Sequence, residues 1–282
     1  MMLDLETFRL RSKAIYPENC LQRKLIVLKQ YDDFLEKNGL KPGLDSLNLW
    51  LDELLKRGLS NNTLRAYFYD VLSYFEIMMV EVDEKKLRLV KKRLPPSKTK
   101  EVDFLTEEEV ARLINRTPSP IRKLIYAIMY SYGRRLGEVL LLTRKDVDLN
   151  KNTITFTILK KRSGERATYE LEEWIKEMII KYDKMLGRDK LFEITERAIE
   201  IAFKKDCKRA GIEPKGRSLR PHILRHSRIS HLREAGVPLD VVSKFVARHS
   251  RFDTTVQFYR AVTEEEKVSI PKAEEVLKLK PA

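Results

Sequence analysis

Apolar residues recur every three or four positions through much of the chain, which is the spacing of one buried helix face. The run over residues 21–35 follows this spacing and ends at Asn38, which a glycine follows. A second helix is expected over residues 44–55, and Ser60 is a suitable N-cap for a third over residues 63–80. The first third of the sequence is therefore expected to form a small helical domain.

The remaining two thirds combine helices with one β region. A capping box, Thr106 with Glu109 three residues later, opens the first helix of this part. Polar and apolar residues alternate over residues 153–159, and after a Ser-Gly turn residues 166–171 can return as the partner strand. Further helices are expected over residues 121–132, 136–142, 174–186, 195–210, 221–234, 238–247 and 254–261. The predicted fold class is mainly α with a small antiparallel β-sheet.

Two consecutive prolines, Pro95-Pro96, interrupt the helical pattern within a basic stretch. Proline cannot continue a helix because it lacks the backbone N–H and clashes with the preceding turn. We therefore expect a helical domain over residues 1–92, a basic linker over residues 93–102 and a second domain over residues 103–282. A chain of 282 residues is long enough for two domains of ordinary size.

The chain carries 56 Lys and Arg against 42 Asp and Glu, a formal net charge of +14. Such an excess favours a polyanionic partner, above all nucleic acid. No stretch approaches the ~18 apolar residues of a membrane span, and the charged N-terminus lacks the apolar segment of a secretion signal. Cys20 and Cys207 fit separate thiols in a reducing cytoplasm, and no histidine or cysteine spacing indicates a metal site. Abundant Lys and Glu are compatible with growth at high temperature.

Two short basic motifs carry the candidate chemistry. Arg134 and Arg135 stand at a predicted helix start, and Glu138 follows three residues after Arg135 on the same face. Either this is a solvated ion pair, or the carboxylate holds an arginine for a phosphate, which a guanidinium binds through two parallel hydrogen bonds. His222 and Arg225 are also three residues apart at a helix start, which alone indicates no more than a basic helix face.

A histidine and a tyrosine near the C-terminus complete a characteristic order of residues. Along the chain stand Arg135, a lysine on the predicted β-turn (Lys160 or Lys161), His222-x-x-Arg225, His249 and Tyr259. In order and in local context this set resembles the catalytic residues of the tyrosine recombinase, or phage integrase, family. The resemblance spans nearly the whole chain, and it is strongest to the Xer branch, especially the archaeal XerA-type proteins.

Three departures from the family pattern concern individual positions. Arg248 stands where family members commonly have glycine, and the spacing from the next histidine to the tyrosine is one residue longer than in Xer proteins. The turn at residues 159–164 lacks the common Gly-Lys-Gly form. Counting back from the Glu-Arg pair after this turn favours Lys161 over Lys160 as the catalytic lysine, and the choice stays open.

The resemblance implies a fold, a reaction and a role for each matched residue. The fold is a helical core-binding domain of the SAM-like type followed by a mixed α/β catalytic domain. The reaction cuts and rejoins DNA through a 3′-phosphotyrosyl intermediate and a Holliday junction, without a cofactor or a metal ion. The implied roles are nucleophile for Tyr259, phosphate clamps for Arg135 and Arg225, general acid for Lys161, proton transfer for His222, a phosphate hydrogen bond for His249 and orientation for Glu138.

The expected partners are duplex DNA with a short inverted-repeat site and further copies of the chain, as a tetramer on paired sites. Candidate DNA contacts outside the catalytic set are Asn62, Arg65, Lys98, Lys100 and Arg134. Chromosome dimer resolution is the expected role, and integration or excision of a mobile element is the close alternative. The tail over residues 264–282 could dock on its own domain or on a neighbouring protomer.

Two other functions stay open on the residues alone. Residues 222–249 follow a pattern of helix, glycine-containing turn and helix, so a non-catalytic helix-turn-helix DNA-binding protein would account for them. That alternative leaves the motif around Arg135 unexplained, and it makes Tyr259 a structural residue. A type IB topoisomerase-like relaxase would share the tyrosine nucleophile with a recombinase.

Overall fold

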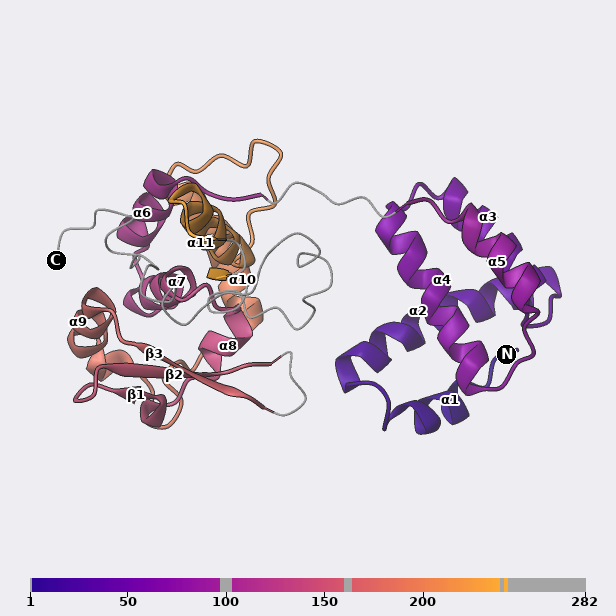
Figure 1. The fold of residues 1–282 in the computed structure, drawn as a ribbon, viewed down its shortest axis with the longest axis horizontal. Coiled ribbons are helices and arrows are strands. Elements are labelled where there is room, and N and C mark those ends of the chain that lie inside the picture. Colours follow the sequence, from indigo (N-terminus) through magenta and orange to yellow (C-terminus); the bar gives the residue numbers. More distant parts are fainter. Residues whose placement is uncertain (1, 97–102, 160–163, 239–240, 243–282) are drawn as a thin grey trace. The chain divides into compact units, whose positions relative to one another are not determined.

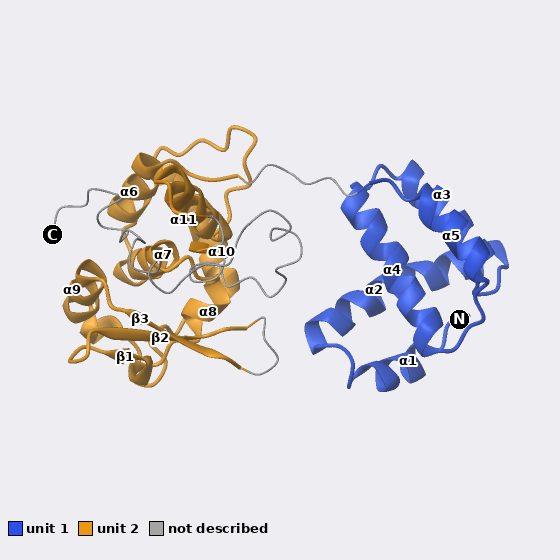
Figure 2. Ribbon diagram, viewed as in Figure 1, with its two compact units in different colours: residues 1–100 blue, residues 101–282 orange. Residues whose placement is uncertain are grey.

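The computed structural model describes residues 2–96, 103–159, 164–238 and 241–242. The chain divides into two compact units, unit 1 over residues 1–100 and unit 2 over residues 101–282 (Figure 2). Most of the predicted linker over residues 93–102 lies outside the described residues, so the linker and the domain boundaries next to it stay a prediction.

Helices form the described part of unit 1 (Figure 1): α1 Leu5–Ser12, α2 Glu18–Asn38, α3 Leu44–Lys56, α4 Asn61–Ile77 and α5 Glu84–Arg93. The three predicted helices are confirmed as α2, α3 and α4. Gly39 ends α2 in the left-handed conformation at φ +61°, which glycine adopts without strain. Ser60 caps α4, because its side chain accepts a hydrogen bond from the backbone N–H of Thr63.

Two helices of unit 1 fall outside the sequence prediction. The short helix α1 starts after Asp4, whose carboxylate accepts the backbone N–H of Thr7. Helix α5 runs to Arg93, so the first residue of the predicted linker is still helical. The helix ends at Arg93 because Leu94 precedes Pro95. A residue before proline avoids helical backbone, and Leu94 is extended at ψ 128°.

Unit 1 has a core of its own. Trp50 is fully buried, and its ring centroid lies 5.1 Å from that of Tyr31. A buried ion pair, Lys24 Nζ to Asp70 Oδ1 at 2.8 Å, links α2 to α4. The buried carboxylate of Asp32 accepts the backbone N–H of a residue at the start of the chain. Both buried carboxylates therefore join segments that are distant in sequence.

Unit 2 is mainly helical. Its helices are α6 Glu107–Arg116, α7 Pro120–Ser131, α8 Leu136–Leu140, η1 Arg144–Asp146, α9 Glu173–Lys181, η2 Asp183–Met185, α10 Glu196–Arg209 and α11 His222–Glu234. The strands are β1 Val147–Asp148, β2 Thr153–Thr157 and β3 Arg166–Glu170. They form one antiparallel sheet in the order β1-β2-β3, with Thr153 opposite Glu170 and Thr157 opposite Arg166. The predicted fold class is confirmed.

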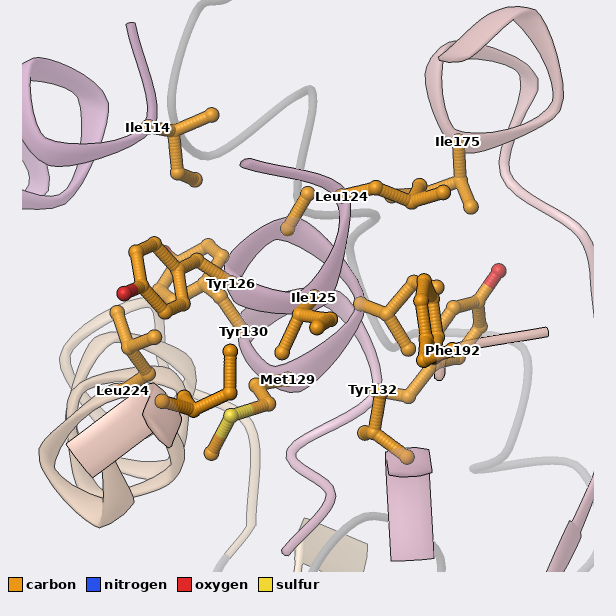
Figure 3. Close-up of a cluster of buried hydrophobic side chains, with 14 of the residues drawn as sticks. Ile114, Leu124, Ile125, Tyr126, Met129, Tyr130, Tyr132, Ile175, Phe192 and Leu224 are labelled. Carbon is orange, nitrogen blue, oxygen red and sulfur yellow. The ribbon is translucent and has the colours of Figure 1, made fainter. Parts of the chain in front are cut away.

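Helix α7 is the centre of the unit 2 core. Every residue from Leu124 to Ser131 on it is buried, so it is apolar all round rather than along one stripe. It packs against α6, α8, α9 and α11. In the close-up of Figure 3, Leu224 of α11 approaches one side of α7, and Ile175 of α9 and Phe192 approach other sides. Because neighbours surround α7, its C-terminal end is held in place.

Several predicted elements of unit 2 differ in length or were missed. Strand β1 has no counterpart in the prediction. The helix predicted over residues 174–186 is wrong in its last part, because α9 ends at Lys181 and the 3-10 turn η2 follows. Arg144 donates hydrogen bonds to the carbonyl oxygens of Asp183 and Gly187, which replaces bonds within a longer helix. The helices predicted over residues 238–247 and 254–261 lie outside the described residues, apart from residues 238 and 241–242.

Candidate active site

The turn between α7 and α8 sets the direction of the first arginine motif. Gly133 has φ +59°, and its N–H donates to the carbonyl of Tyr130 at 3.2 Å. The N–H of Arg134 donates to the carbonyl of Met129 at 3.1 Å. These two bonds form the Schellman arrangement that ends a helix abruptly. Helix α8 then starts within a few residues, with Arg135 at its N-cap.

Arg135 and Glu138 form an ion pair across the first turn of α8. The Nη1 atom of Arg135 donates to Oε1 of Glu138 at 2.7 Å, and the backbone N–H of Arg135 donates to Oε2 at 3.2 Å. The Glu138 side chain is fully buried, whereas 16% of the Arg135 side chain is exposed. The carboxylate therefore holds the arginine from the protein side. The exposed part of the guanidinium can reach an anion in solvent.

Helix α11 brings the second arginine to the same turn. Ile223 and Leu224 are buried in the unit 2 core, which fixes the rotation of the helix. Arg225 is 1% exposed, and its Nη1 donates to the backbone carbonyl of Gly133. This bond joins residues that are 92 positions apart, so the two basic motifs meet at one turn.

The charges around Arg225 are unbalanced. Burial, followed by the positive charges of Arg135 and Arg134, lowers the pKa of Arg225 to about 9, although the carboxylate of Glu138 opposes the shift. The guanidinium groups of Arg135 and Arg134 thus repel that of Arg225, and the carboxylate of Glu138 offsets only part of this repulsion. An anion beside Arg135 would relieve this repulsion. The arrangement is suited to bind a phosphate and to stabilise negative charge that develops on it.

Two histidines lie near the start of α11. His222 is exposed, and its ring centroid lies 4.7 Å from that of His226 with the rings nearly perpendicular. Burial and the positive charge of Arg225 lower the pKa of His226 below its ordinary value. The His226 imidazole is therefore neutral at pH 7. His222 is the more accessible of the two for proton transfer with a bound group.

Some of the other candidate residues from the sequence lie outside the described residues, and others are described on α4. Lys160, Lys161, His249, Tyr259, Lys98 and Lys100 lie outside the described residues. Asn62 is exposed near the start of α4. Arg65, one turn further on, donates from Nη1 to the carbonyl of Pro95 at 3.3 Å. Asn61 donates to the carbonyl of Pro96 at 3.0 Å, so the start of α4 also holds the segment that leaves α5.

Arg134, a candidate DNA contact in the sequence, is buried in the described structure. Its side chain is 1% exposed. The Nε atom donates to the carbonyl of Tyr132 at 2.9 Å, and the guanidinium lies over the rings of Tyr169 and Phe156. Sequence reasoning treated both arginines of the motif as exposed, and it missed the aromatic residues that cover one of them. The alternation of apolar positions along the two strands was the available signal, since it directs Phe156 to the core.

A second buried cluster also lacked a sequence signal. The carboxylate of Asp206 on α10 accepts two hydrogen bonds from Arg122 of α7, at 2.8 and 3.2 Å. It also accepts from the hydroxyl of Tyr126 at 3.1 Å and from Arg209 at 3.1 Å. Arg122 and Tyr126 are 80 or more positions away from Asp206, so no local spacing indicates them, whereas Arg209 stands at the local i,i+3 spacing. The cluster joins α7 to α10.

A metal site and a membrane-spanning helix are both absent from the described residues. Among them, no group of three or more histidine, cysteine, aspartate or glutamate side chains gathers as metal ligands would. In the same residues, no helix combines the length and the apolar character that crossing a membrane requires.

Comparison with known proteins gives matches at the level of family, sequence and fold. Residues 103–266 match the model of the phage integrase family. The chain is 32% identical over 245 residues to tyrosine recombinase XerA of Thermococcus kodakarensis, covering 82% of this chain and 80% of that protein. Its fold is similar to the Tn1549 transposon integrase in complex with transposon right end DNA, with a TM-score of 0.71 and 17% identity over 93% of this chain and 95% of that one. A lambda integrase dimer bound to a core site gives a TM-score of 0.66 and 14% identity over 92% and 97%.

Proposed function

Because the chain belongs to the phage integrase family and is a tyrosine-type site-specific recombinase of the XerA type, we propose that it resolves chromosome dimers. It does so by recombining two copies of a short inverted-repeat DNA site. The observation that supports this most strongly is the meeting of Arg135 and Arg225 at one turn with the buried carboxylate of Glu138. A pair of oriented guanidinium groups with excess positive charge suits a phosphodiester.

The proposed reaction is an exchange of phosphodiester bonds. The phenol oxygen of Tyr259 attacks the scissile phosphorus, the bond from phosphorus to the 5′ oxygen breaks, and a 3′-phosphotyrosyl link forms. Lys161, or Lys160 in its place, gives the leaving 5′ oxygen its proton. His222 assists removal of the phenol proton, whose ordinary pKa of ~10 is too high for neutral pH. A 5′ hydroxyl from the partner strand then reverses the step, so the bond energy is kept without ATP.

The arginines act on the charge of the transition state. A phenolate and a phosphodiester together bring two negative charges, which gather on the non-bridging oxygens. Arg135 and Arg225 donate to those oxygens, and His249 adds a further hydrogen bond. Fixed donors of this kind need no rearrangement during the reaction, and loss of one costs typically ~10²–10³ in rate.

The proposed partners are duplex DNA and three further copies of the chain. Helix α4 offers Asn62 and Arg65 to the DNA from unit 1, and Lys98 and Lys100 add charge from the linker. The net charge of +14 supports a polyanionic partner. The two similar solved structures are of integrases bound to DNA, one of them as a dimer on a core site. A tetramer on paired sites then passes through a Holliday junction.

The similarity to XerA favours dimer resolution over integration or excision of a mobile element. These roles use the same chemistry and differ in the position of the DNA site. A site near one chromosomal locus and outside any mobile element supports dimer resolution. A site that coincides with the end of an integrated element supports the alternative.

The test is covalent trapping on fragmented genomic DNA. The protein is incubated with the fragments, denatured in SDS and captured, and the attached DNA is sequenced. We expect one short inverted-repeat site with the wild type and with the control Tyr182→Phe, and none with Tyr259→Phe. Attachment that survives Tyr259→Phe would exclude this nucleophile. Many unrelated sequences would favour a topoisomerase-like relaxase, and tight binding without attachment would favour a helix-turn-helix DNA-binding protein.

A truncation tests whether the tail over residues 264–282 docks on a neighbouring protomer. Removing the residues after Val268 leaves the proposed catalytic set intact. If the tail docks on a neighbouring protomer, the truncated protein still cleaves the site and loses strand exchange. If the tail docks on its own domain, cleavage and exchange change together.

A further inference from the structure

Arg134 stands directly before Arg135 and occupies a buried aromatic site. Its guanidinium carbon lies 5.1 Å from the ring centroid of Tyr169 on β3 and 5.8 Å from that of Phe156 on β2. Its Nε donates to the carbonyl of Tyr132 at 2.9 Å. A planar cation over aromatic faces is attracted by the ring quadrupoles, more strongly where water is excluded. The side chain therefore joins the turn before α8 to both strands of the hairpin.

The aromatic rings under Arg134 hold one another in place. The ring centroids of Tyr132 and Phe156 lie 5.4 Å apart, and each lies 5.9 Å from that of Tyr169. The hydroxyl of Tyr132 donates to the carbonyl of Glu170 at 3.2 Å and accepts the N–H of Glu172 at 3.0 Å. The rings thus form a platform with fixed geometry. A side chain that stacks on this platform is itself fixed.

Burying a charged side chain at this position costs free energy of folding. Removing a guanidinium from water carries a large desolvation penalty, and an apolar side chain of similar size commonly packs in its place at no loss of stability. Methionine would fill the aromatic site and contact the same rings. Contact with the rings alone therefore does not require an arginine, and the hydrogen bond to the Tyr132 carbonyl requires a donor but not a positive charge. The charge requires another explanation, and the neighbouring site supplies one.

We propose that Arg134 is a positioning residue for the phosphate site: it anchors Arg135 to the aromatic platform and adds a third positive charge without touching the phosphate. This inference rests on the proposed function of the site. With Arg135 and Arg225 it supplies more positive charge than the carboxylate of Glu138 balances. This excess lies where a phenolate attacking a phosphodiester brings negative charge. Electrostatic attraction across a buried site is weakly screened, so the third charge acts at a distance.

The lowered pKa of Arg225 supports a role for the charge of Arg134 at this site. After burial and the charge of Arg135, the charge of Arg134 is the next cause that lowers the pKa of Arg225. The same repulsion that destabilises the empty site turns into attraction when an anion binds there. Arg134 therefore costs stability in the empty protein and contributes affinity in the occupied one.

The test compares two full-length variants with a matched control. Arg134→Met removes the charge and keeps the bulk, Arg134→Lys keeps the charge and loses the planar stack, and Arg116→Met removes an exposed charge at the end of α6. Affinity is measured calorimetrically with inorganic phosphate at low ionic strength. We expect Arg134→Met to weaken phosphate binding about 10-fold, with the Lys variant and the control within about threefold of the wild type. We also expect the thermal midpoint of Arg134→Met to equal or exceed that of the wild type.

The second readout is covalent trapping on genomic DNA. Both Arg134 variants are expected to trap about 10-fold less DNA than the wild type, because Arg135 loses its anchor. Wild-type phosphate affinity in Arg134→Met would overturn the proposal, as would equal losses of affinity in the Met and Lys variants. A lowered thermal midpoint in Arg134→Met would assign the residue to stability instead. If the wild type traps no DNA, the proposed function fails, whereas the phosphate titration still decides the role of Arg134.

Discussion

The guanidinium of Arg225 donates a hydrogen bond to the backbone carbonyl of Gly133, which lies 92 positions earlier in the chain. The donor stands on α11, and the acceptor stands in the turn that ends α7. Because α7 and α11 pack against each other, their contact fixes the separation of the two arginine motifs. The geometry of the phosphate site is therefore a property of the unit 2 core.

The first prediction concerns Arg225. Replacing it by lysine keeps a positive charge but removes the planar fork that can bond both the Gly133 carbonyl and a phosphate oxygen. We expect covalent complex formation with DNA to fall by about 10²–10³. The rate of SDS-resistant complex formation measures this. Arg233→Lys, at an exposed position in the last turn of the same helix, is the control and should match the wild type. A rate for Arg225→Lys within about threefold of the wild type would contradict the assignment.

The second prediction concerns the buried carboxylate of Glu138. In Glu138→Gln the side chain can no longer balance the charge of Arg135, and one buried bond is lost. We expect the free energy of unfolding to fall by about 1–3 kcal/mol and trapping to fall with it. Urea unfolding gives the first value. Glu53→Gln removes the exposed partner of Arg57 on α3 and should change stability by less than about 0.5 kcal/mol. Equal effects of the two variants would refute a special role for the buried carboxylate.

The third prediction concerns Asp206, which joins α7 to α10. Replacing it by asparagine leaves the guanidinium of Arg122 without its carboxylate in a partly buried place. We expect a loss of about 3 kcal/mol in the free energy of unfolding. Phosphate affinity should stay unchanged in the folded variant, because the cluster does not adjoin Arg135. Asp183→Asn, where the carboxylate is exposed and paired with Arg144, serves as the control with a small effect. A drop in phosphate affinity without a loss of stability would point to a role in the site instead.

The fourth prediction concerns pH. Burial lowers the pKa of His226 and of His231 below 6.5, with the charge of Arg225 as a further cause for His226. The unfolded chain therefore binds protons that the folded chain does not, so stability is lost as the pH falls below ~6.5. We expect the thermal midpoint to stay level from pH 8 to about pH 7 and to decrease from there to pH 5. In His226→Gln this decrease should be smaller. A midpoint that is flat over this range, or a slope unchanged in the variant, would contradict the shifts.

Local sequence signals determined much of the fold. The end of α2 at Gly39 and the start of α4 at Ser60 depend on contacts within a few residues, so their residue types identify them. The capping box at Thr106 is confirmed for the same reason, because both of its hydrogen bonds are present. The alternation of buried and exposed side chains along β2 and β3 follows from the strand pleat alone, so the sequence pattern indicates it. The early end of α9 could not be predicted, because Arg144 reaches it from 39 positions away.

The sequence by itself also determined the composition of the candidate site. The order of Arg135, His222, Arg225, His249 and Tyr259 carries the family resemblance, and the family match covers residues 103–266. Only the tertiary structure decided how the described members of this set are used. In the fold, Arg225 donates a hydrogen bond to Gly133, and the buried carboxylate of Glu138 pairs with Arg135. The guanidinium of Arg134 lies over the ring of Tyr169. Burial and charge depend on neighbours that are distant in sequence, and packing of α7, α11 and the hairpin supplies those neighbours.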